Sequence, residues 1–312
     1  MGFARTCSVA LVGVEGVVVE VQADLEPGVA AFTLVGLPDK SGSGFDLAVA
    51  CAVLGAAERI DPRELADLVM IGELGLDGRV RPVRGILPAV LAAAEAGYEQ
   101  VVVPEQTAAE ASLVPGISVL GVRSLRQLIA VLTDEPVPEE EPDQEGRPDA
   151  MLAGLVVPGA GVGTGLSIDA DTSPHDLADV AGQHTARTAL EVAAAGGHHL
   201  MLYGPPGAGK TMLAERLPGI LPPLTRQESL EVTAIHSVAG ILPPGKPLVH
   251  KAPYCAPHHS ATMQSLVGGG NGLPRPGAVS LAHRGVLFLD DATDGLCTLQ
   301  ARRITRGRQV GV

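Results

Sequence analysis

Residues 204–211 constrain the fold of this chain more than any other segment. They read Gly204-Pro205-Pro206-Gly207-Ala208-Gly209-Lys210-Thr211, a complete G-x-x-x-x-G-K-[ST] pattern, and they directly follow the apolar run 199–203. Glycines are needed there because a Cβ would clash with a phosphate chain or forbid positive φ values. Lys210 offers a charge to the β- and γ-phosphates, and Thr211 offers a hydroxyl to Mg²⁺ where a helix begins. The pattern predicts a strand, a loop that binds ATP and Mg²⁺, and a helix.

Length and composition bound the remaining possibilities. A chain of 312 residues with 46% hydrophobic content is typical of two domains with sizeable cores. The longest apolar stretches fall short of the roughly 18 residues that span a membrane, and no signal-peptide pattern begins the chain. We therefore expect a cytoplasmic protein without a membrane segment. The cysteines are far apart and form no C-x-x-C pair, which favours reduced, buried thiols over disulfides or zinc: Cys7, Cys51, Cys255 and Cys297.

A linker is expected between the two domains. The net charge is −13, and segment 134–149 alone holds eight carboxylates against Arg147, a net charge of −7. A proline-interrupted acidic run cannot bury enough apolar surface to fold. The glycine-rich stretch 158–165 lacks both a lysine and the G-x-G-x-x-G spacing, so it favours a flexible connection over a second nucleotide loop. These features predict a linker at 134–166 between domains at 1–133 and 167–291.

The first domain shows strand and helix patterns in alternation. Periodicity and β-propensity predict strands at 17–21, 31–35, 68–73, 76–80, 101–103 and 117–119, and helices at 45–59, 87–96 and 125–132. An Asp-Gly turn is expected between the third and fourth of these strands. The first domain is therefore predicted to be an α/β module.

The second domain contains another segment with candidate catalytic residues. Residues 285–291 form an apolar run that ends in Asp290 and Asp291, which resembles a Walker B motif. Asp290 would hold Mg²⁺ through water, and Asp291 would orient the attacking water for in-line hydrolysis.

Thr225 and Glu228 form a capping box that predicts a helix start. The adjacent histidines His258 and His259 could ligate a metal. Adjacent side chains point apart, however, and no third ligand is evident, so a structural or substrate-loop role is favoured.

Motifs in the first domain resemble the magnesium-chelatase-like AAA+ proteins of the YifB/ComM type. They are FTLVGLP at 32–38, GFDL at 44–47 and GELGLDGRV at 72–80. The resemblance implies a Lon-protease-like (S5-type) fold for residues 1–133. Lon proteases use a Ser–Lys dyad, whose positions fall here at Gly44 and Leu87, and neither residue can act as nucleophile or base. We expect a docking or regulatory scaffold rather than a peptidase.

Motifs in the second domain are similar to the same family at 176–183, 193–199, 235–240, 256–259 and 275–277. They imply a P-loop AAA+ core with a parallel sheet, nucleotide contacts at Val180 and Gly182, Mg²⁺ bound through Thr211 and Asp290, and a catalytic role for Asp291. The family has Glu at this last position. Asp is one methylene shorter, and a displacement of about 1 Å can cost on the order of 10²-fold in rate.

Two departures from the family pattern stand out. Between Lys40 and Ser41 the family has a further helix and strand, so the first domain is expected to be incomplete. After Asp291 the resemblance is expected to stop, and the tail at 292–312 is predicted to have no helix or strand and no sensor asparagine, arginine finger or helical lid. Its arginines could form a nucleic-acid arm. A frameshifted or truncated end is favoured, because the break falls within a motif.

The resemblance implies that complete relatives form an ATP-driven homo-oligomeric ring linked to DNA branch migration during recombination, and that truncation impairs ATP hydrolysis by this chain. Two alternatives stay open. One is a chelatase-type motor subunit for inserting magnesium into a porphyrin, and the other is a nucleotide-binding or interaction module that does not hydrolyse ATP.

Overall fold

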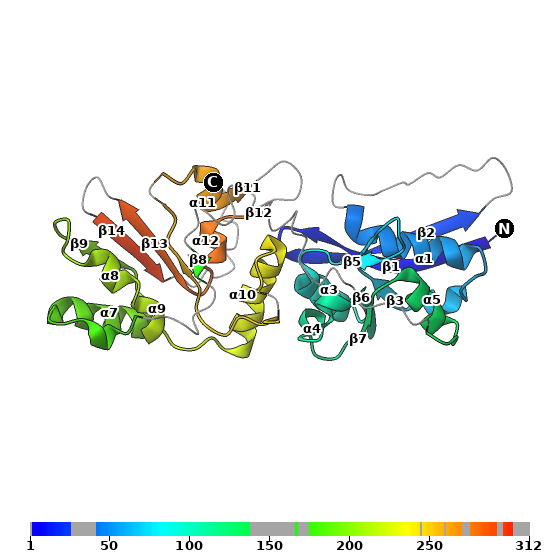
Figure 1. Ribbon diagram of the computed structural model, residues 1–312, viewed down its shortest axis with the longest axis horizontal. Helices are drawn as coiled ribbons and strands as arrows, with labels where there is room; N and C mark the ends of the chain where they lie inside the picture. The colour runs from blue at the N-terminus through cyan, green and yellow to red at the C-terminus, as the bar shows by residue number, and fades with distance from the viewer. Residues whose placement is uncertain are drawn as a thin grey trace. The chain divides into compact units, whose positions relative to one another are not determined.

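The computed structural model describes residues 2–25, 42–137, 166–167, 175–243, 245–258, 260–269, 275–291 and 296–301 (Figure 1). The chain divides into two compact units. The first comprises residues 1–144, 233–247 and 271–274, and the second comprises residues 145–232, 248–270 and 275–312. The strand predicted at 31–35 and most of the linker predicted at 134–166 lie outside the described residues.

The first unit is built on a five-stranded sheet with the order β2-β1-β3-β6-β7. Its strands are β1 (Gly2–Val12), β2 (Glu15–Leu25), β3 (Leu68–Met70), β6 (Gln100–Pro104) and β7 (Ser118–Val122). The first two form an antiparallel hairpin, and the other neighbouring pairs are parallel. Gly13, with φ +67°, supplies the left-handed backbone of the hairpin turn. The sheet is therefore mixed, with a parallel interior.

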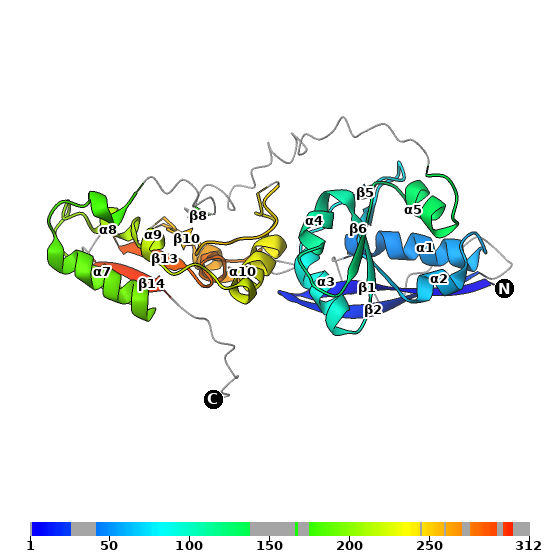
Figure 2. The ribbon, with the colours of Figure 1, turned by 90° about the horizontal axis from the view of Figure 1, so that it is seen from below.

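Helices cover this sheet. They are η1 (Gly42–Phe45), α1 (Asp46–Ala56), α2 (Pro62–Ala66), α3 (Ile86–Glu95), η2 (Glu105–Thr107), α4 (Ala108–Ala111) and α5 (Leu125–Leu132). Figure 2 shows α1 and α2 along the β1–β2 hairpin, against which α1 also packs. Ser124 caps α5 by accepting the Gln127 N–H at 3.0 Å. Leu47, Met70 and Leu128 are fully buried in the core cluster of this unit.

One predicted strand is divided in two. The segment expected as a single strand at 68–73 forms β3 and then β4 (Glu73–Leu74), which pairs with β5 (Val80–Arg81) in a separate antiparallel hairpin. Where the chain leaves the main sheet, the Gly72 N–H donates to the Gly44 carbonyl at 3.1 Å. The expected Asp-Gly turn closes the hairpin, with Gly78 at φ +80°.

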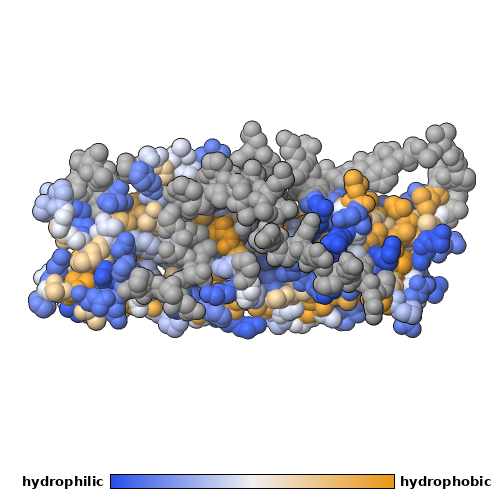
Figure 3. All heavy atoms as spheres, viewed as in Figure 1, coloured by the Kyte–Doolittle hydropathy of each residue, from blue (hydrophilic) through white to orange (hydrophobic). Residues whose placement is uncertain are grey.

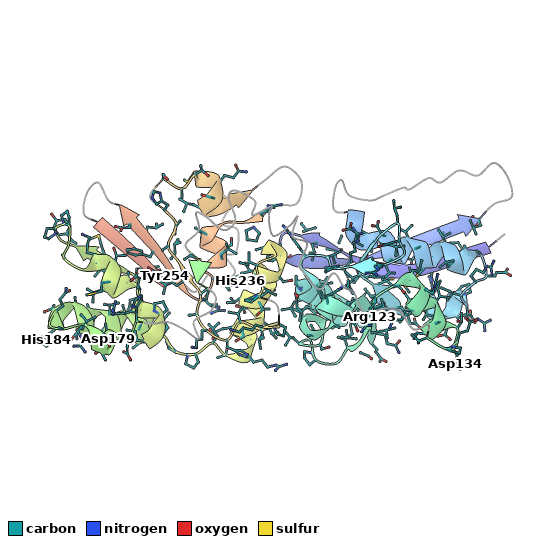
Figure 4. All side chains as sticks on the ribbon, in the orientation of Figure 1. Arg123, Asp134, Asp179, His184, His236 and Tyr254 are labelled. Carbon is teal, nitrogen blue, oxygen red and sulfur yellow. The ribbon has the colours of Figure 1, made fainter. Side chains whose placement is uncertain are left out.

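Residues 233–247 pack in the first unit. The Gly85 N–H donates to the Ser237 carbonyl at 3.2 Å, and the Ser237 hydroxyl bonds the Glu110 carboxylate. The Leu87 N–H donates to the same carboxylate at 3.0 Å. Burial raises the pKa of Glu110 and outweighs these two hydrogen bonds, which lower it. His236, labelled in Figure 4, is fully buried in this segment.

The second unit has a sheet with the order β8-β10-β13-β14-β9. Its strands are β8 (Leu166–Ser167), β9 (Leu200–Tyr203), β10 (Tyr254–Cys255), β13 (Val286–Asp291) and β14 (Leu296–Ala301). Its other elements are η4 (Leu177–Asp179), α7 (His184–Gly196), α8 (Lys210–Ala214), α9 (Leu217–Ile220), α11 (Met263–Val267), α12 (Ala278–Leu281) and the small hairpin of β11 (Gly268–Gly269) and β12 (Arg275–Pro276). Helix α10 (Arg226–Ala239) contributes its residues before Thr233 to this unit.

The expected parallel pairing is present between β10 and β13, and antiparallel strands accompany it; the expectation of a tail without strands was wrong. Strand β14 lies in the tail and is antiparallel to both β13 and β9, whereas β10 and β13 are parallel. Without β14, the facing edges of β9 and β13 would each leave a row of backbone donors and acceptors unpaired. Backbone pairing of this kind does not require an alternating side-chain pattern, which is why the sequence did not reveal it.

The core of the second unit is aliphatic. Leu190, Leu217 and Phe288 are among its buried members. The Phe288 ring stacks on Tyr254, with 6.4 Å between centroids; Tyr254 is labelled in Figure 4. This agrees with the low aromatic content of the chain. Among the described residues, no helix is both long and apolar enough to cross a membrane. Figure 3 shows apolar and hydrophilic residues interspersed on the face it views.

The cysteine prediction is confirmed for the three thiols that the structure describes. Cys7, Cys51 and Cys255 are buried and free. Burial raises the pKa of Cys51 and of Cys255 to about 12, so both thiols stay protonated near neutral pH.

We predict that Leu47→Ala lowers the free energy of unfolding of the first unit by about 2–5 kcal/mol, because a fully buried leucine leaves a cavity. The chain has no tryptophan, and Tyr98 is the single tyrosine of the first unit. Urea unfolding followed by tyrosine fluorescence in a Tyr203→Phe, Tyr254→Phe background therefore reports on this unit. Leu76→Ala, at a fully exposed position, is the matched control and should change stability by less than about 0.5 kcal/mol. Equal effects of the two substitutions would contradict the assigned core.

Candidate nucleotide site

The backbone of the predicted phosphate loop is left-handed at two of its glycines. It connects β9 to α8, with Gly207 at φ +81° and Gly209 at φ +84°. A Cβ on Gly209 would also lie only 3.1 Å from Nε2 of Gln183. The Leu213 N–H donates to the Gly209 carbonyl at 3.0 Å, so the helical hydrogen bonds begin immediately after the loop. The predicted order of strand, loop and helix is confirmed.

Lys210 lies across the loop. Its Nζ donates to the Gly204 carbonyl at 2.9 Å and to the Pro205 carbonyl at 3.2 Å. The ammonium group is therefore held against carbonyls of the loop itself, where phosphate oxygens would compete for its protons.

The two predicted magnesium ligands meet at one edge of the sheet. Strands β9 and β13 run in the same direction, because β14 between them is antiparallel to both. Their carboxyl ends therefore share an edge. Across that edge the Thr211 hydroxyl donates to Oδ2 of Asp290 at 3.4 Å, between residues 79 positions apart. A hydroxyl and a carboxylate are hard oxygen donors of the kind that Mg²⁺ prefers, so the pair fits this ion.

Asp291 is the last residue of β13 and pairs with Leu296. Its side chain, which the sequence predicts to orient water, lies outside the part of the chain whose side chains the structure describes.

The segment that holds Val180 and Gly182 reaches the loop through a residue that we did not predict. The Gln183 Nε2 donates to the Ala208 carbonyl at 3.1 Å, and Arg187 donates to the Val180 carbonyl at 3.2 Å. Gln183 adopts a left-handed conformation, with φ +48°, at the start of α7. The available sequence signal was the Gly182–Gln183 pair shortly after Val180. The contact that Gln183 makes with the loop joins residues 25 positions apart, so no local sequence pattern indicates it.

A charged cluster lies just before β13. The Arg284 guanidinium donates to Glu231 Oε2 from Nε at 3.0 Å and from a terminal nitrogen at 2.8 Å, and to Glu228 Oε1 at 3.2 Å. The His283 Nε2 lies 3.2 Å from the same oxygen of Glu231. Burial raises the pKa of Glu231, but hydrogen bonds from Arg284 and His283 outweigh it and hold that pKa below its usual value.

The backbone of Arg284 is strained. Its φ of +60° is left-handed, which costs on the order of 1–3 kcal/mol for a residue with a side chain. The sequence analysis missed this cluster. Its signals were two glutamates spaced i, i+3 on a helix and an arginine directly before a buried strand.

The remaining candidate residues form no comparable site. His258 Nδ1 lies 2.7 Å from the Ser260 hydroxyl, and His259 is outside the described residues. Within the described ranges, no group of three or more His, Cys, Asp or Glu side chains could hold a metal. In the first unit, Leu87, which the sequence analysis assigned to the lysine position of the Lon dyad, is fully buried.

An open groove of about 700 Å³ runs along α7. Its lining includes His184, labelled in Figure 4, together with His198 and His199, and no residue of the loop. The groove therefore does not belong to the nucleotide site.

Comparison with known proteins identifies relatives of both halves. A family model described as magnesium chelatase, subunit ChlI, matches residues 176–299, and one described as subunit ChlI of Mg-chelatase matches residues 39–107. The first match extends eight residues beyond Asp291, so the expectation that the resemblance stops there was wrong.

Curated relatives cover most of the chain. An uncharacterized protein of Mycobacterium tuberculosis is 47% identical over 343 aligned residues, which cover 97% of this chain and 63% of the relative. The competence protein ComM of Haemophilus influenzae is 34% identical over 93% of this chain and 60% of its own length. The YifB protein of Salmonella typhimurium is 38% identical over 81% of this chain and 45% of its own length. A local similarity to the Lon protease of Geobacter metallireducens, at 30% identity, covers 36% of this chain.

Two features of these alignments bear on the chain's length. The chain spans less than two thirds of the length of the curated relatives it matches. The mycobacterial alignment runs over 343 positions although the chain has 312 residues, so at least 31 residues of the relative face gaps here. That number is sufficient for the additional helix and strand expected between residues 40 and 41. On the family models and these relatives together, the chain belongs to the magnesium-chelatase-like family that includes ComM and YifB.

Proposed function

We propose that this chain binds ATP with Mg²⁺ at the loop 204–211 and that the same site hydrolyses ATP. The observation that carries the proposal is the approach of Thr211 Oγ1 to Asp290 Oδ2, at 3.4 Å, beside a phosphate loop whose lysine is held against the loop's own Gly204 carbonyl. Two segments 79 residues apart thus supply the donor set that a nucleotide–magnesium complex requires.

Each residue of the site has a distinct role. The loop's backbone N–H groups bind the phosphates, and Lys210 offsets the charge of the β- and γ-phosphates. Thr211 and Asp290 would hold Mg²⁺, which supplies charge neutralisation at the transferring phosphoryl group. Asp291 orients the attacking water. Val180 and Gly182 contact the nucleotide, with Gln183 fixing their segment against the loop.

At the level of assembly, we extend the proposal to an ATP-driven homo-oligomeric ring linked to DNA branch migration, the role that the resemblance to the YifB/ComM type implies. One relative carries the name competence protein. The alternatives are a motor subunit for magnesium insertion into a porphyrin and a module that binds nucleotide without hydrolysing it. An ATPase assay separates the last of these from the other two.

We predict that Lys210→Ala weakens binding of a fluorescent ATP analogue by about 10- to 100-fold, since a hydrogen bond to a charged group contributes about 1.5–3 kcal/mol. The matched control is Lys251→Ala, which removes an exposed lysine of the same unit outside the loop. Titration by fluorescence anisotropy measures both. Equal affinities for wild type and Lys210→Ala would place the nucleotide elsewhere.

We predict that Asp291→Glu raises the rate of ATP hydrolysis by up to about 10²-fold, because the longer side chain restores the reach of the family's glutamate. Asp291→Asn should lower the rate below wild type. Steady-state phosphate release measures the effect, with the Lys210→Ala protein as the blank. A rate unchanged in both variants would remove Asp291 from the catalytic site.

We predict that the monomeric chain binds duplex DNA negligibly at about 150 mM salt, because a net charge of −13 repels phosphate. Under the ring proposal, addition of Mg²⁺ and a non-hydrolysable ATP analogue should increase binding, since assembly brings several weak contacts onto one duplex. Anisotropy of labelled DNA with and without nucleotide tests this. Binding that is tight without nucleotide and insensitive to salt would contradict the expectation.

A further inference from the structure

We propose that Arg284 is a positioning residue that fixes the register of β13 and thereby the place of Asp290 opposite Thr211. This inference rests on the proposed nucleotide function. It is carried by the geometry of the turn before β13 and by the two glutamates of α10 that hold that turn.

The apolar pattern of β13 does not by itself select one register. Val286 and Phe288 point to one face and Leu287 and Leu289 to the other, so both faces of the strand are apolar. A shift by one residue would exchange the two faces and still place apolar side chains on each. The same shift would turn Asp290 away from Thr211. Something outside the strand must therefore choose the register.

The turn at 282–285 makes this choice. The Gly285 N–H donates to the Ala282 carbonyl at 2.9 Å, which closes the turn, and the Val286 N–H donates to the Pro253 carbonyl at 2.8 Å, which begins the pairing with β10. A Cβ at Gly285 would lie 2.0 Å from the Pro253 oxygen, so the turn can approach β10 only through glycine. The position of this turn therefore determines the register of every later residue in β13.

Arg284 holds the turn against α10. Its guanidinium makes three hydrogen bonds to Glu231 and Glu228, at 2.8 to 3.2 Å, and its side chain is only 17% exposed. Its left-handed backbone, with φ +60°, is a conformation that these contacts must maintain. A planar fork that spans two carboxylates is specific to arginine, because a lysine ammonium has no such geometry.

Helix α10 offers a fixed partner for this contact. Glu228 uses its other oxygen, Oε2, in the capping box, where it accepts the Thr225 N–H at 3.1 Å and the Thr225 hydroxyl at 2.9 Å. One carboxylate therefore defines the start of α10 and binds Arg284. His283 adds a contact to Glu231 from the turn itself, at 3.2 Å.

The test measures the magnesium response of nucleotide binding. A fluorescent ATP analogue is titrated onto the full chain first in EDTA and then with increasing MgCl₂. In Arg284→Ala and in Glu231→Gln, the analogue should bind in EDTA as in wild type, because the loop is unchanged. The Mg²⁺ concentration for half-maximal binding of the analogue should rise by up to about 10- to 100-fold, the range seen when the support that orients a metal ligand is lost. Arg284→Lys should restore little of the response. Arg275→Ala, at an exposed arginine of the same unit, is the control and should leave it unchanged.

A second measurement is independent of nucleotide. In hydrogen–deuterium exchange, Arg284→Ala is compared with wild type. The positioning role predicts that the substitution accelerates exchange of the β13 amides, beginning at Val286, more than exchange of the α7 amides. A merely stabilising ion pair would accelerate exchange in both elements to the same extent. If Arg284→Ala does not fold, Arg284→Lys and Glu231→Gln carry the comparison.

The outcomes separate the two proposals. Wild-type protein that binds no nucleotide would overturn the proposed function and, with it, this inference. Wild-type protein that binds nucleotide and responds to Mg²⁺, with the same response in the Arg284 and Glu231 variants, would overturn the positioning role alone. A uniform increase in exchange across the second unit would also overturn it.

Discussion

The common direction of β9 and β13 is the constraint on which the site depends. One strand leads into the glycine-rich phosphate loop, and the other leads into two carboxylates. Because both strands run the same way in one sheet, their ends share an edge, and Thr211 comes within 3.4 Å of Asp290. Backbone hydrogen bonding thus creates the donor set, and the side chains only occupy the positions it provides.

Local physical chemistry explains what the sequence predicted well. The phosphate loop, the capping box at Thr225 and the helix at 125–132 each depend on interactions within a few residues, and all three are present in the structure. Caps, positive φ values and helical periodicity each depend on residues of one segment, so the local sequence is sufficient to predict them. The same holds for the Asp-Gly turn that closes the β4–β5 hairpin.

The features that the sequence did not reveal depend on distant partners. Gln183 is significant because Ala208 lies against it, and Arg284 because Glu231 does. Strand β14 forms because two edges need a partner, although its own pattern is weak. The packing of residues 233–247 in the first unit depends on Gly85 and Glu110, more than a hundred positions earlier in the chain. Each requires the fold to be known before the residue can be interpreted.

The charged cluster before β13 shows why composition alone misjudges such residues. An arginine paired with two glutamates would ordinarily be assigned to a solvated surface, where ion pairs contribute about 0–1 kcal/mol. Here the same three side chains are at most 35% exposed and the arginine has a left-handed backbone. A strained residue persists only when its surroundings determine it. The strand that follows is apolar on both faces and does not select its own register. The position of Asp290 therefore depends on polar contacts made outside the strand.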